Sequence, residues 1–276
     1  MNIQIEIEHL KIQTGFYKDS INLISEFGYS ELTSVIGPML TLNESSLQSI
    51  ILLAENKHYR DLIILSRPFL ESVLNVGFIC ADENAITNSK KYAYQKGYRD
   101  LFRDIEINGF KMKSNLMNYI SEFENAAPTP MKEALSDFTT KSGKEVISWT
   151  PETAKAKLEV IGKVYGEYVN SLLSFAFFSI YRDVSEIIHN SYYGVRIFLG
   201  MQQKDMSSFK SSKEAAIFFG EHQEKLATLI LQQLNISICS MINILKQRFN
   251  IETLDILYEK SNSELLEYTK KVKRSA

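Results

Sequence analysis

The chain has 276 residues, of which 45% are hydrophobic and 23% are charged, so it can bury a full core as one large domain or two closely packed lobes. Its 12 glycines and 5 prolines are few, and it has no long run of serine, glutamine or one charge, which excludes a disordered protein. The net charge of -2 excludes a surface that attracts nucleic acid over its whole area.

Apolar residues recur at helical spacing along most of the chain. At residues 3–7, isoleucines alternate with polar residues, a pattern that fits either a short strand or a helix. Thr41 with Glu44 forms a capping-box pattern, and Thr150 before Pro151 is typical of an N-cap and a first helical residue. The predicted helices span about residues 14–27, 41–56, 59–80, 111–125, 131–138, 150–193 and 213–249, with a polar amphipathic segment at 82–107 and breaks at 139–148 and 200–212.

These segments predict an all-α fold, a single bundle of about eight to ten helices that includes the whole chain, with a short N-terminal strand as an alternative at the start. A second interpretation divides the chain into two lobes, 1–138 and 150–276, joined by the loop 139–149. Residues 213–249 are apolar on most faces, and we expect them, together with residues 172–193, at the centre of the bundle.

Cysteine usage and hydropathy favour a cytoplasmic protein that is not embedded in a membrane. Cys80 and Cys239 lie in apolar surroundings, and neither has a neighbour at metal-ligand spacing, so we expect no disulfide scaffold and no metal or other cofactor. The N-terminus lacks a signal pattern, and the apolar stretch 172–181 is too short to span a bilayer.

Basic residues cluster locally in two places. Lys96, Arg99 and Arg103 recur at helical spacing, and residues 270–274 are rich in lysine and arginine. We interpret both clusters mainly as solvated surfaces.

A polar stripe runs along the otherwise apolar helix predicted at 59–80. Arg67, Glu71 and Asn75 follow one another at four-residue spacing, and Pro68 is expected to kink or restart the helix. Since an unpaired buried Arg or Glu is costly, this stripe should be paired internally, meet a partner helix or face a cleft. An Arg67–Glu71 ion pair is the simplest interpretation, and a supporting role in a site is the alternative.

A second polar pattern places Arg182 and His189 on one helix face. They are seven residues apart, which at about 100° per residue returns to within about 20° of the same direction. Ile180, Val184 and Ile187 point the opposite way and form the predicted core stripe. The pair is therefore directed toward solvent, a cleft or another subunit.

Arginine and histidine so placed suit phosphodiester chemistry without a metal. A guanidinium can hold a phosphate and stabilise its developing charge, while an imidazole can move the proton of a 2′-hydroxyl or of the leaving oxygen. A purely structural alternative pairs Arg182 with Glu186 one turn on and leaves His189 at the helix end, where the dipole favours it.

Arg182-Asp183 followed by His189 resembles the motif of the higher-eukaryote and prokaryote nucleotide-binding (HEPN) superfamily, helical bundles in which Arg precedes His late in the chain. The resemblance implies metal-independent RNA cleavage at a composite site between two protomers, often in toxins and antiviral defence proteins. Arg67-Pro-x-x-Glu71 together with Ser185-x-x-x-His189 also resembles a group of uncharacterised bacterial helical proteins, over about residues 45–200.

The leading hypothesis is a HEPN-like ribonuclease that acts on RNA as a homodimer. His189 would act as general acid or base and Arg182 would hold the phosphate, while Glu186, Asn190 and Tyr193 would orient them. The main alternative is a non-catalytic interaction or ligand-sensing module with a protein partner, favoured by the acidic pI and the many Tyr and Phe. A third alternative is a small-molecule enzyme with Arg67, Glu71 and His189 in one pocket.

Overall fold

The computed structural model describes residues 2–102, 105–112 and 129–275, and this part of the chain folds as an all-α protein with ten α-helices, as predicted. The helices are α1 (Ile3–Glu26), α2 (Glu31–Glu55), α3 (Tyr59–Ala81), α4 (Glu83–Phe102), α6 (Thr129–Asp137), α7 (Ala154–Tyr165), α8 (Glu167–Ile188), α9 (Tyr192–Phe198), α10 (Ser212–Phe249) and α11 (Glu252–Ser275). The chain forms two compact units, one of residues 1–81 with 153–276 and one of residues 82–152. The boundaries of the smaller unit therefore differ from the predicted division at 139–149.

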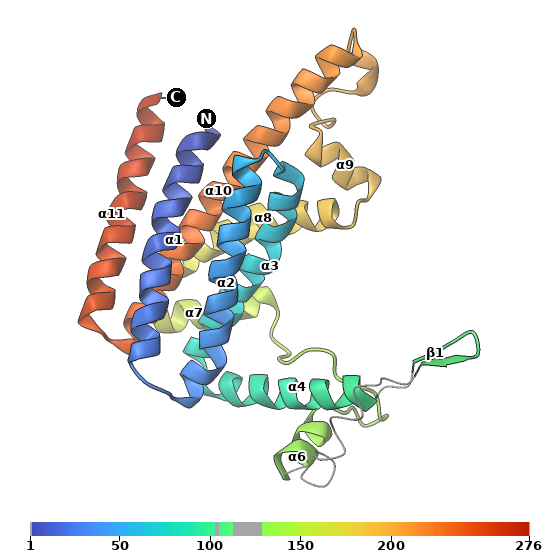
Figure 1. Cartoon of the computed structure of the whole chain (residues 1–276), viewed down its shortest axis with the longest axis vertical. Helices are drawn as coiled ribbons and strands as arrows, with labels where there is room; N and C mark the ends of the chain where they lie inside the picture. Colours follow the sequence, from blue (N-terminus) through green and yellow to red (C-terminus); the bar gives the residue numbers. More distant parts are fainter. Residues whose placement is uncertain (1, 103–104, 113–128, 276) are drawn as a thin grey trace. The chain divides into compact units, whose positions relative to one another are not determined.

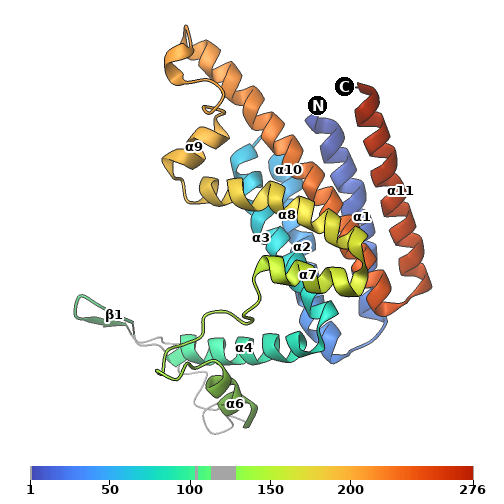
Figure 2. The ribbon, with the colours of Figure 1, turned by 180° about the vertical axis from the view of Figure 1, so that it is seen from behind.

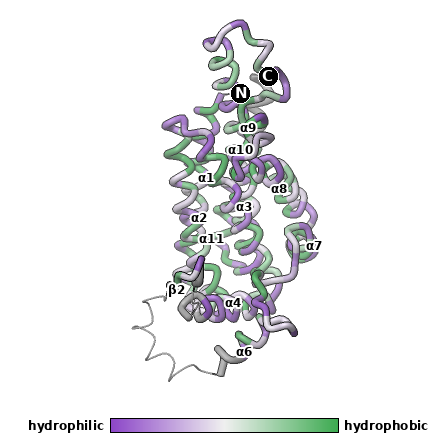
Figure 3. The backbone as a smooth tube through the Cα atoms, turned by 90° about the vertical axis from the view of Figure 1, so that its right-hand side faces the viewer, coloured by the Kyte–Doolittle hydropathy of each residue, from purple (hydrophilic) through white to green (hydrophobic). Residues whose placement is uncertain are grey.

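Helix α10 is the central element of the larger unit, as predicted. It packs against α1, α3, α8 and α11, which surround it in Figures 1 and 2. From residue 227 to 245 most of its side chains are buried, and they include Leu231, Leu234, Ile238 and Ile242. The other long helices carry hydrophobic and hydrophilic residues in alternation along the backbone (Figure 3), because only one side of each faces this core.

Helices α3 and α10 are long and apolar enough to cross a membrane by length and composition. Within their most apolar windows, however, 61% of α3 and 83% of α10 is buried inside the protein. Core helices of soluble proteins pass the same test, so these two helices are only a weak sign of membrane insertion.

The N-terminal segment is helical, so the alternative of a short strand is wrong. Helix α1 begins at Ile3, and the side chain of the N-cap Asn2 accepts a hydrogen bond from the Gln4 amide at 3.0 Å. Ile7 and Leu10 face the core at helical spacing, whereas Ile5 is largely exposed. The alternation of isoleucines with polar residues resembles a strand, but only one of these isoleucines lies on the buried face of the helix.

The predicted helix start at Thr41 is also wrong. Helix α2 begins ten residues earlier with a capping box between Ser30 and Thr33, and the Thr41 hydroxyl donates to the Gly37 carbonyl within the helix. Helix α3 matches its predicted range, and it runs through Pro68 without restarting.

Helix α7 begins later than predicted. Its N-cap is Thr153, whose side chain accepts from the Ala156 amide, while Thr150 and Pro151 lie in the preceding loop. The long predicted helix 150–193 is divided at Gly166, which has a φ of 95° and separates α7 from α8. A residue with a side chain is strained at such a φ, so glycine favours the turn.

In the smaller unit, α4 is followed by an antiparallel hairpin of β1 (Ile105–Ile107) and β2 (Phe110–Met112). The turn residues Asn108 and Gly109 both have positive φ, as the tight turns that join such strands require. The helix predicted at 111–125 overlaps β2 at its start, and the rest of it lies outside the described residues. Helix α6 and the loop 139–148 confirm their predictions.

Candidate functional site

Helix α8 has the two faces that its sequence predicts. Val169, Leu173 and Ala176 are buried against the core, and the predicted core residues Ile180, Val184 and Ile187 continue the same stripe. Arg182 and His189 are both exposed on the other side. The predicted direction of the pair, away from the core, is therefore confirmed.

Neither the Arg182 nor the His189 side chain forms a hydrogen bond or ion pair with another residue in the described ranges. The alternative of an Arg182–Glu186 pair is not realised there: the Glu186 carboxylate accepts a hydrogen bond from the Ser191 hydroxyl at 2.9 Å instead. Seven residues at about 1.5 Å per residue place the two backbones about 10 Å apart along the helix. Both polar heads are thus available to a ligand or a partner chain.

A tight corner between α8 and α9 holds His189. This residue caps the C-terminus of α8, and Asn190 follows in the left-handed conformation with a φ of 50°. Ser191 then caps α9 by accepting from the Gly194 amide at 3.0 Å while it donates to Glu186. A Cβ on Gly194 would lie 2.1 Å from the Glu186 carbonyl oxygen, so the close approach of the two helices requires glycine.

Sequence reasoning assigned no role to Ser191 or Gly194. Their partner, Glu186, was predicted to orient the reacting groups, and in the structure its carboxylate accepts a hydrogen bond from the Ser191 hydroxyl. The signal that could have identified them is the Ser-x-x-Gly spacing directly after the helix end, which is a common N-cap arrangement. Tyr193 lies in the same corner and is 47% exposed.

The polar stripe of α3 is paired internally, as predicted. Arg67 Nε lies 2.9 Å from Glu71 Oε1, and Asn75 Oδ1 accepts from Lys157 Nζ at 2.7 Å. The Arg67 guanidinium also lies over the Tyr181 ring, with 4.4 Å between Cζ and the ring centroid. Burial lowers the pKa of Arg67, but the combined interactions with Glu71 and Tyr181 outweigh this effect and raise the pKa above its ordinary value.

The contact with Tyr181 connects the α3 stripe to α8 but not to His189. Tyr181 precedes His189 by eight residues, or about 12 Å along the helix. Arg67 and Glu71 therefore support the α8 helix at the level of Arg182, while His189 lies two turns away. This arrangement gives no support to one small-molecule pocket that contains Arg67, Glu71 and His189.

Exposed aromatic residues extend the polar face of α8 toward its N-terminus. Phe178 is 73% exposed and Phe175 is 57% exposed, and neither was singled out from the sequence. Together with Arg182, Ser185 and His189 they recur at alternating spacings of three and four residues. That spacing is typical of a helix face that meets another helix, and it could have identified Phe175 and Phe178 from the sequence.

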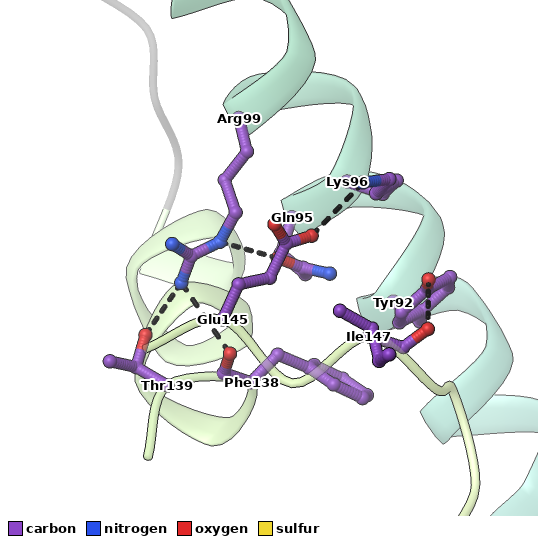
Figure 4. Close-up of polar contacts among 8 residues, drawn as sticks. All are labelled: Tyr92, Gln95, Lys96, Arg99, Phe138, Thr139, Glu145 and Ile147. Atoms are coloured by element: carbon purple, nitrogen blue, oxygen red, sulfur yellow. Dashed lines mark hydrogen bonds and ion pairs between the residues drawn. The ribbon is translucent and has the colours of Figure 1, made fainter. Parts of the chain in front are cut away.

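The basic cluster of α4 is largely engaged within the smaller unit (Figure 4). Lys96 pairs with Glu145 at 3.1 Å, and the Arg99 guanidinium donates to Gln95, Thr139 and the Phe138 carbonyl. Arg103 and the side chains of residues 270–274 lie outside the described part of the chain. Lys96 and Arg99 thus join α4 to the loop that follows α6.

Metal ligation has no candidate in the described ranges, where no group of three or more His, Cys, Asp or Glu side chains could hold an ion. Cys80 and Cys239 are buried free thiols, and burial raises the pKa of Cys80 to about 12 and that of Cys239 to about 11. Both thiols are consequently protonated at neutral pH and unsuited to nucleophilic attack.

Comparison with known proteins gives one family match. A family profile described as "Family of unknown function (DUF5677)" matches residues 34–206, which extend from α2 through α9. No curated protein matches the chain. No solved structure matches it either.

Proposed function

The chain belongs to the family of unknown function DUF5677, and because that family carries no assigned activity, we propose a function from the geometry of α8. The proposal is a metal-independent ribonuclease of the HEPN type, which acts in the cytoplasm as a homodimer and serves as a toxin or antiviral defence effector. The observation that carries it is the exposure of Arg182 and His189 on one helix face, directed away from the core and without partners in the described ranges.

The proposed reaction uses these two side chains on a single phosphodiester. His189 takes the proton of the ribose 2′-hydroxyl, and the 2′-oxygen attacks the adjacent phosphorus. The bond to the 5′-oxygen breaks, and His189 passes the proton to that oxygen. The products are a 2′,3′-cyclic phosphate and a 5′-hydroxyl end. Arg182 holds the non-bridging oxygens and stabilises the charge that develops on them.

The homodimer brings the two groups closer than one helix does. An antiparallel contact of two α8 helices about a two-fold axis near Ser185 and Glu186 pairs residues at equal distances from the axis. Arg182 then lies opposite His189 of the partner subunit, and Phe178 faces the C-terminal end of α8 in the partner subunit. The contact also covers the exposed Phe178 ring, which would otherwise remain in water.

The test is cleavage of total RNA, together with growth arrest on expression, by the wild type and by His189→Ala and Arg182→Ala. We expect either change to lower the cleavage rate at least about 100-fold, since general acid–base catalysis contributes about that much or more. His58→Ala and Arg60→Ala are matched controls, because both residues lie at the start of α3, outside α8 and the α8–α9 corner. The proposal is wrong if the wild type neither cleaves RNA nor arrests growth, or if His189→Ala behaves like the wild type.

A second candidate, a non-catalytic interaction module, rests on the exposed Phe175 and Phe178. In that case α8 would bind a helix of another protein through its aromatic residues, and Arg182 and His189 would only flank the contact. Inactive wild-type protein that forms a stable complex lost in Phe178→Glu but kept in His189→Ala would favour this function.

A further inference from the structure

Helix α11 is attached to the rest of the larger unit through a row of buried polar side chains as well as apolar ones. It packs on α1 and α10, and Figures 1 and 2 both show it beside α1. We call this row the α11 seam, and it consists of Glu6, His9 and Gln13 on α1, Gln232 on α10, and Ser261 and Tyr268 on α11. All are buried except Gln232, which is half-buried.

Glu6 is joined to α11 through Gln232. The Gln232 amide donates to Glu6 Oε1 at 2.8 Å, and its nitrogen also lies 3.0 Å from the Tyr268 hydroxyl. The Tyr268 ring stacks on the His9 ring with 4.5 Å between centroids. One polar cluster therefore connects all three helices near the start of α1.

A second polar contact lies two turns further along α1. The Gln13 amide donates to the Ser261 carbonyl at 2.9 Å, and the Ser261 hydroxyl donates to Gln13 Oε1 at 2.5 Å. Both residues are fully buried. Because these groups are neutral, the strength of this contact does not depend on pH, and the Glu6 cluster is the charge-sensitive part of the seam.

Within the seam, Glu6 Oε2 accepts no hydrogen bond from the described residues, although Glu6 is only 2% exposed. The titratable groups at Glu6 are the chain's amino group, whose positive charge lowers the Glu6 pKa, His9 on α1 and Tyr268 on α11, while α10 contributes the uncharged Gln232. Glu8 and Glu264 line the groove beside His9 and Tyr268. On the exposed side of α1, Lys11 forms ion pairs with Glu8 and Glu55. An ionised Glu6 would thus be a buried charge with one satisfied oxygen, which is costly.

We propose that the protonation state of Glu6 controls the packing of α11. While Glu6 is protonated, α11 stays packed on α1 and α10, and loss of the Glu6 proton loosens α11. Helix α11 is the element that can move, because α1 also packs on α2 while α10 also packs on α3 and α8. Loosening uncovers the side chains that α11 buries, among them Leu254, Leu257 and Leu265.

The pH range follows from Glu6 itself. Burial raises the pKa of Glu6 from 4.5 to about 7, despite the opposing hydrogen bond from Gln232. If the carboxyl regains its ordinary value when α11 opens, the opening equilibrium rises about tenfold between pH 6 and pH 8. Below about pH 4.5 the proton is bound in both states, so opening no longer depends on pH.

The test is amide hydrogen exchange of the full chain at pH 6 and pH 8, with rates corrected for the intrinsic effect of pH. We expect the protection of α11 amides to fall about tenfold from pH 6 to pH 8 in the wild type. Glu6→Gln should keep α11 protected at both pH values. Glu8→Gln, a change at an exposed residue of the same helix, should behave like the wild type.

The proposal is overturned if wild-type α11 protection is the same at pH 6 and pH 8. It is also overturned if Glu6→Gln loses protection with pH as the wild type does. The wild-type measurement alone decides the matter if Glu6→Gln fails to fold. Neither result bears on RNA cleavage, since Glu6 lies on α1 and the proposed catalytic residues lie on α8 and at its end.

Discussion

Gly194 shows how a single residue sets the geometry of the α8–α9 corner. A Cβ atom at this position would lie 2.1 Å from the Glu186 carbonyl oxygen, closer than real Cβ contacts allow. The same turn contains the Ser191 hydroxyl, which bonds the Glu186 carboxylate. His189 is therefore held by backbone packing on its C-terminal side, and a change at Gly194 acts on the candidate site without touching Arg182 or His189.

Gly194→Ala should destabilise the protein by about 2 kcal/mol, the typical cost of forcing an extra carbon into a packed position. Gly220→Ala is the matched control, because Gly220 lies inside α10 and an added methyl group there would have no other atom within 4 Å. That change should stabilise the protein by about 0.5 to 1 kcal/mol, since alanine favours the helix. Urea unfolding of both variants measures the difference, and equal midpoints would contradict the close contact.

The residue pairs that sequence reasoning found are those set by helix periodicity. Arg67 with Glu71 is an i,i+4 pair on one helix, and the structure confirms it. Arg182 and His189 share a face for the same reason. The Glu186–Ser191 bond was not predicted, because it spans a helix end where Asn190 adopts a left-handed conformation that the sequence pattern does not specify.

At the scale of elements, the interiors of helices were easier to predict than their ends. Helices α3 and α10 match their predicted ranges because each has a long apolar stripe. The start of α2 was wrong since several Ser and Thr residues precede apolar runs, and the box that forms uses Thr33 in place of the acidic residue sought. The start of α7 was wrong for a similar reason, with Thr153 chosen over Thr150.

The exposed face of α8 leads to a prediction about assembly. In the proposed homodimer Phe178 is buried, so Phe178→Glu places a charge in an apolar contact and should give a monomer. Leu42→Glu changes a comparably exposed residue on α2 and should leave the dimer intact. Light scattering after size exclusion distinguishes the 31.7 kDa chain from twice that mass. A wild type that is monomeric at all concentrations would contradict the homodimer.

For the whole molecule, the fold class could be predicted but the grouping of helices could not. Composition and periodicity give the all-α class, because they depend on the chain's average properties. The division into residues 1–81 with 153–276, and 82–152, depends on contacts between distant segments. The larger unit is assembled from both halves of the chain, and no local composition change marks that assembly. The α11 seam is hidden for the same reason, since Glu6 and Gln232 are 226 positions apart.

The α11 seam also predicts how overall stability depends on pH. Since the pKa of Glu6 is raised from 4.5 to about 7 in the folded protein, its contribution is most favourable at and below pH 4.5 and is lost as pH rises toward 7. The pKa values of the exposed Glu8 and Glu214 are lowered, chiefly by their hydrogen bonds with Lys11 and Lys204, so these groups act in the opposite direction. A comparison of variants therefore isolates Glu6 better than the wild-type profile does.

Glu6→Gln should become more stable relative to the wild type as pH rises from 5 to 8, by up to about 3 kcal/mol, the limit set by a shift of about 2.5 pKa units. Urea unfolding at both pH values measures this change, and Glu8→Gln should show no such gain. A stability difference between Glu6→Gln and the wild type that stays constant from pH 5 to pH 8 would mean that Glu6 keeps its ordinary pKa. The seam would then be a neutral polar contact, and α11 would be held equally well at every pH in this range.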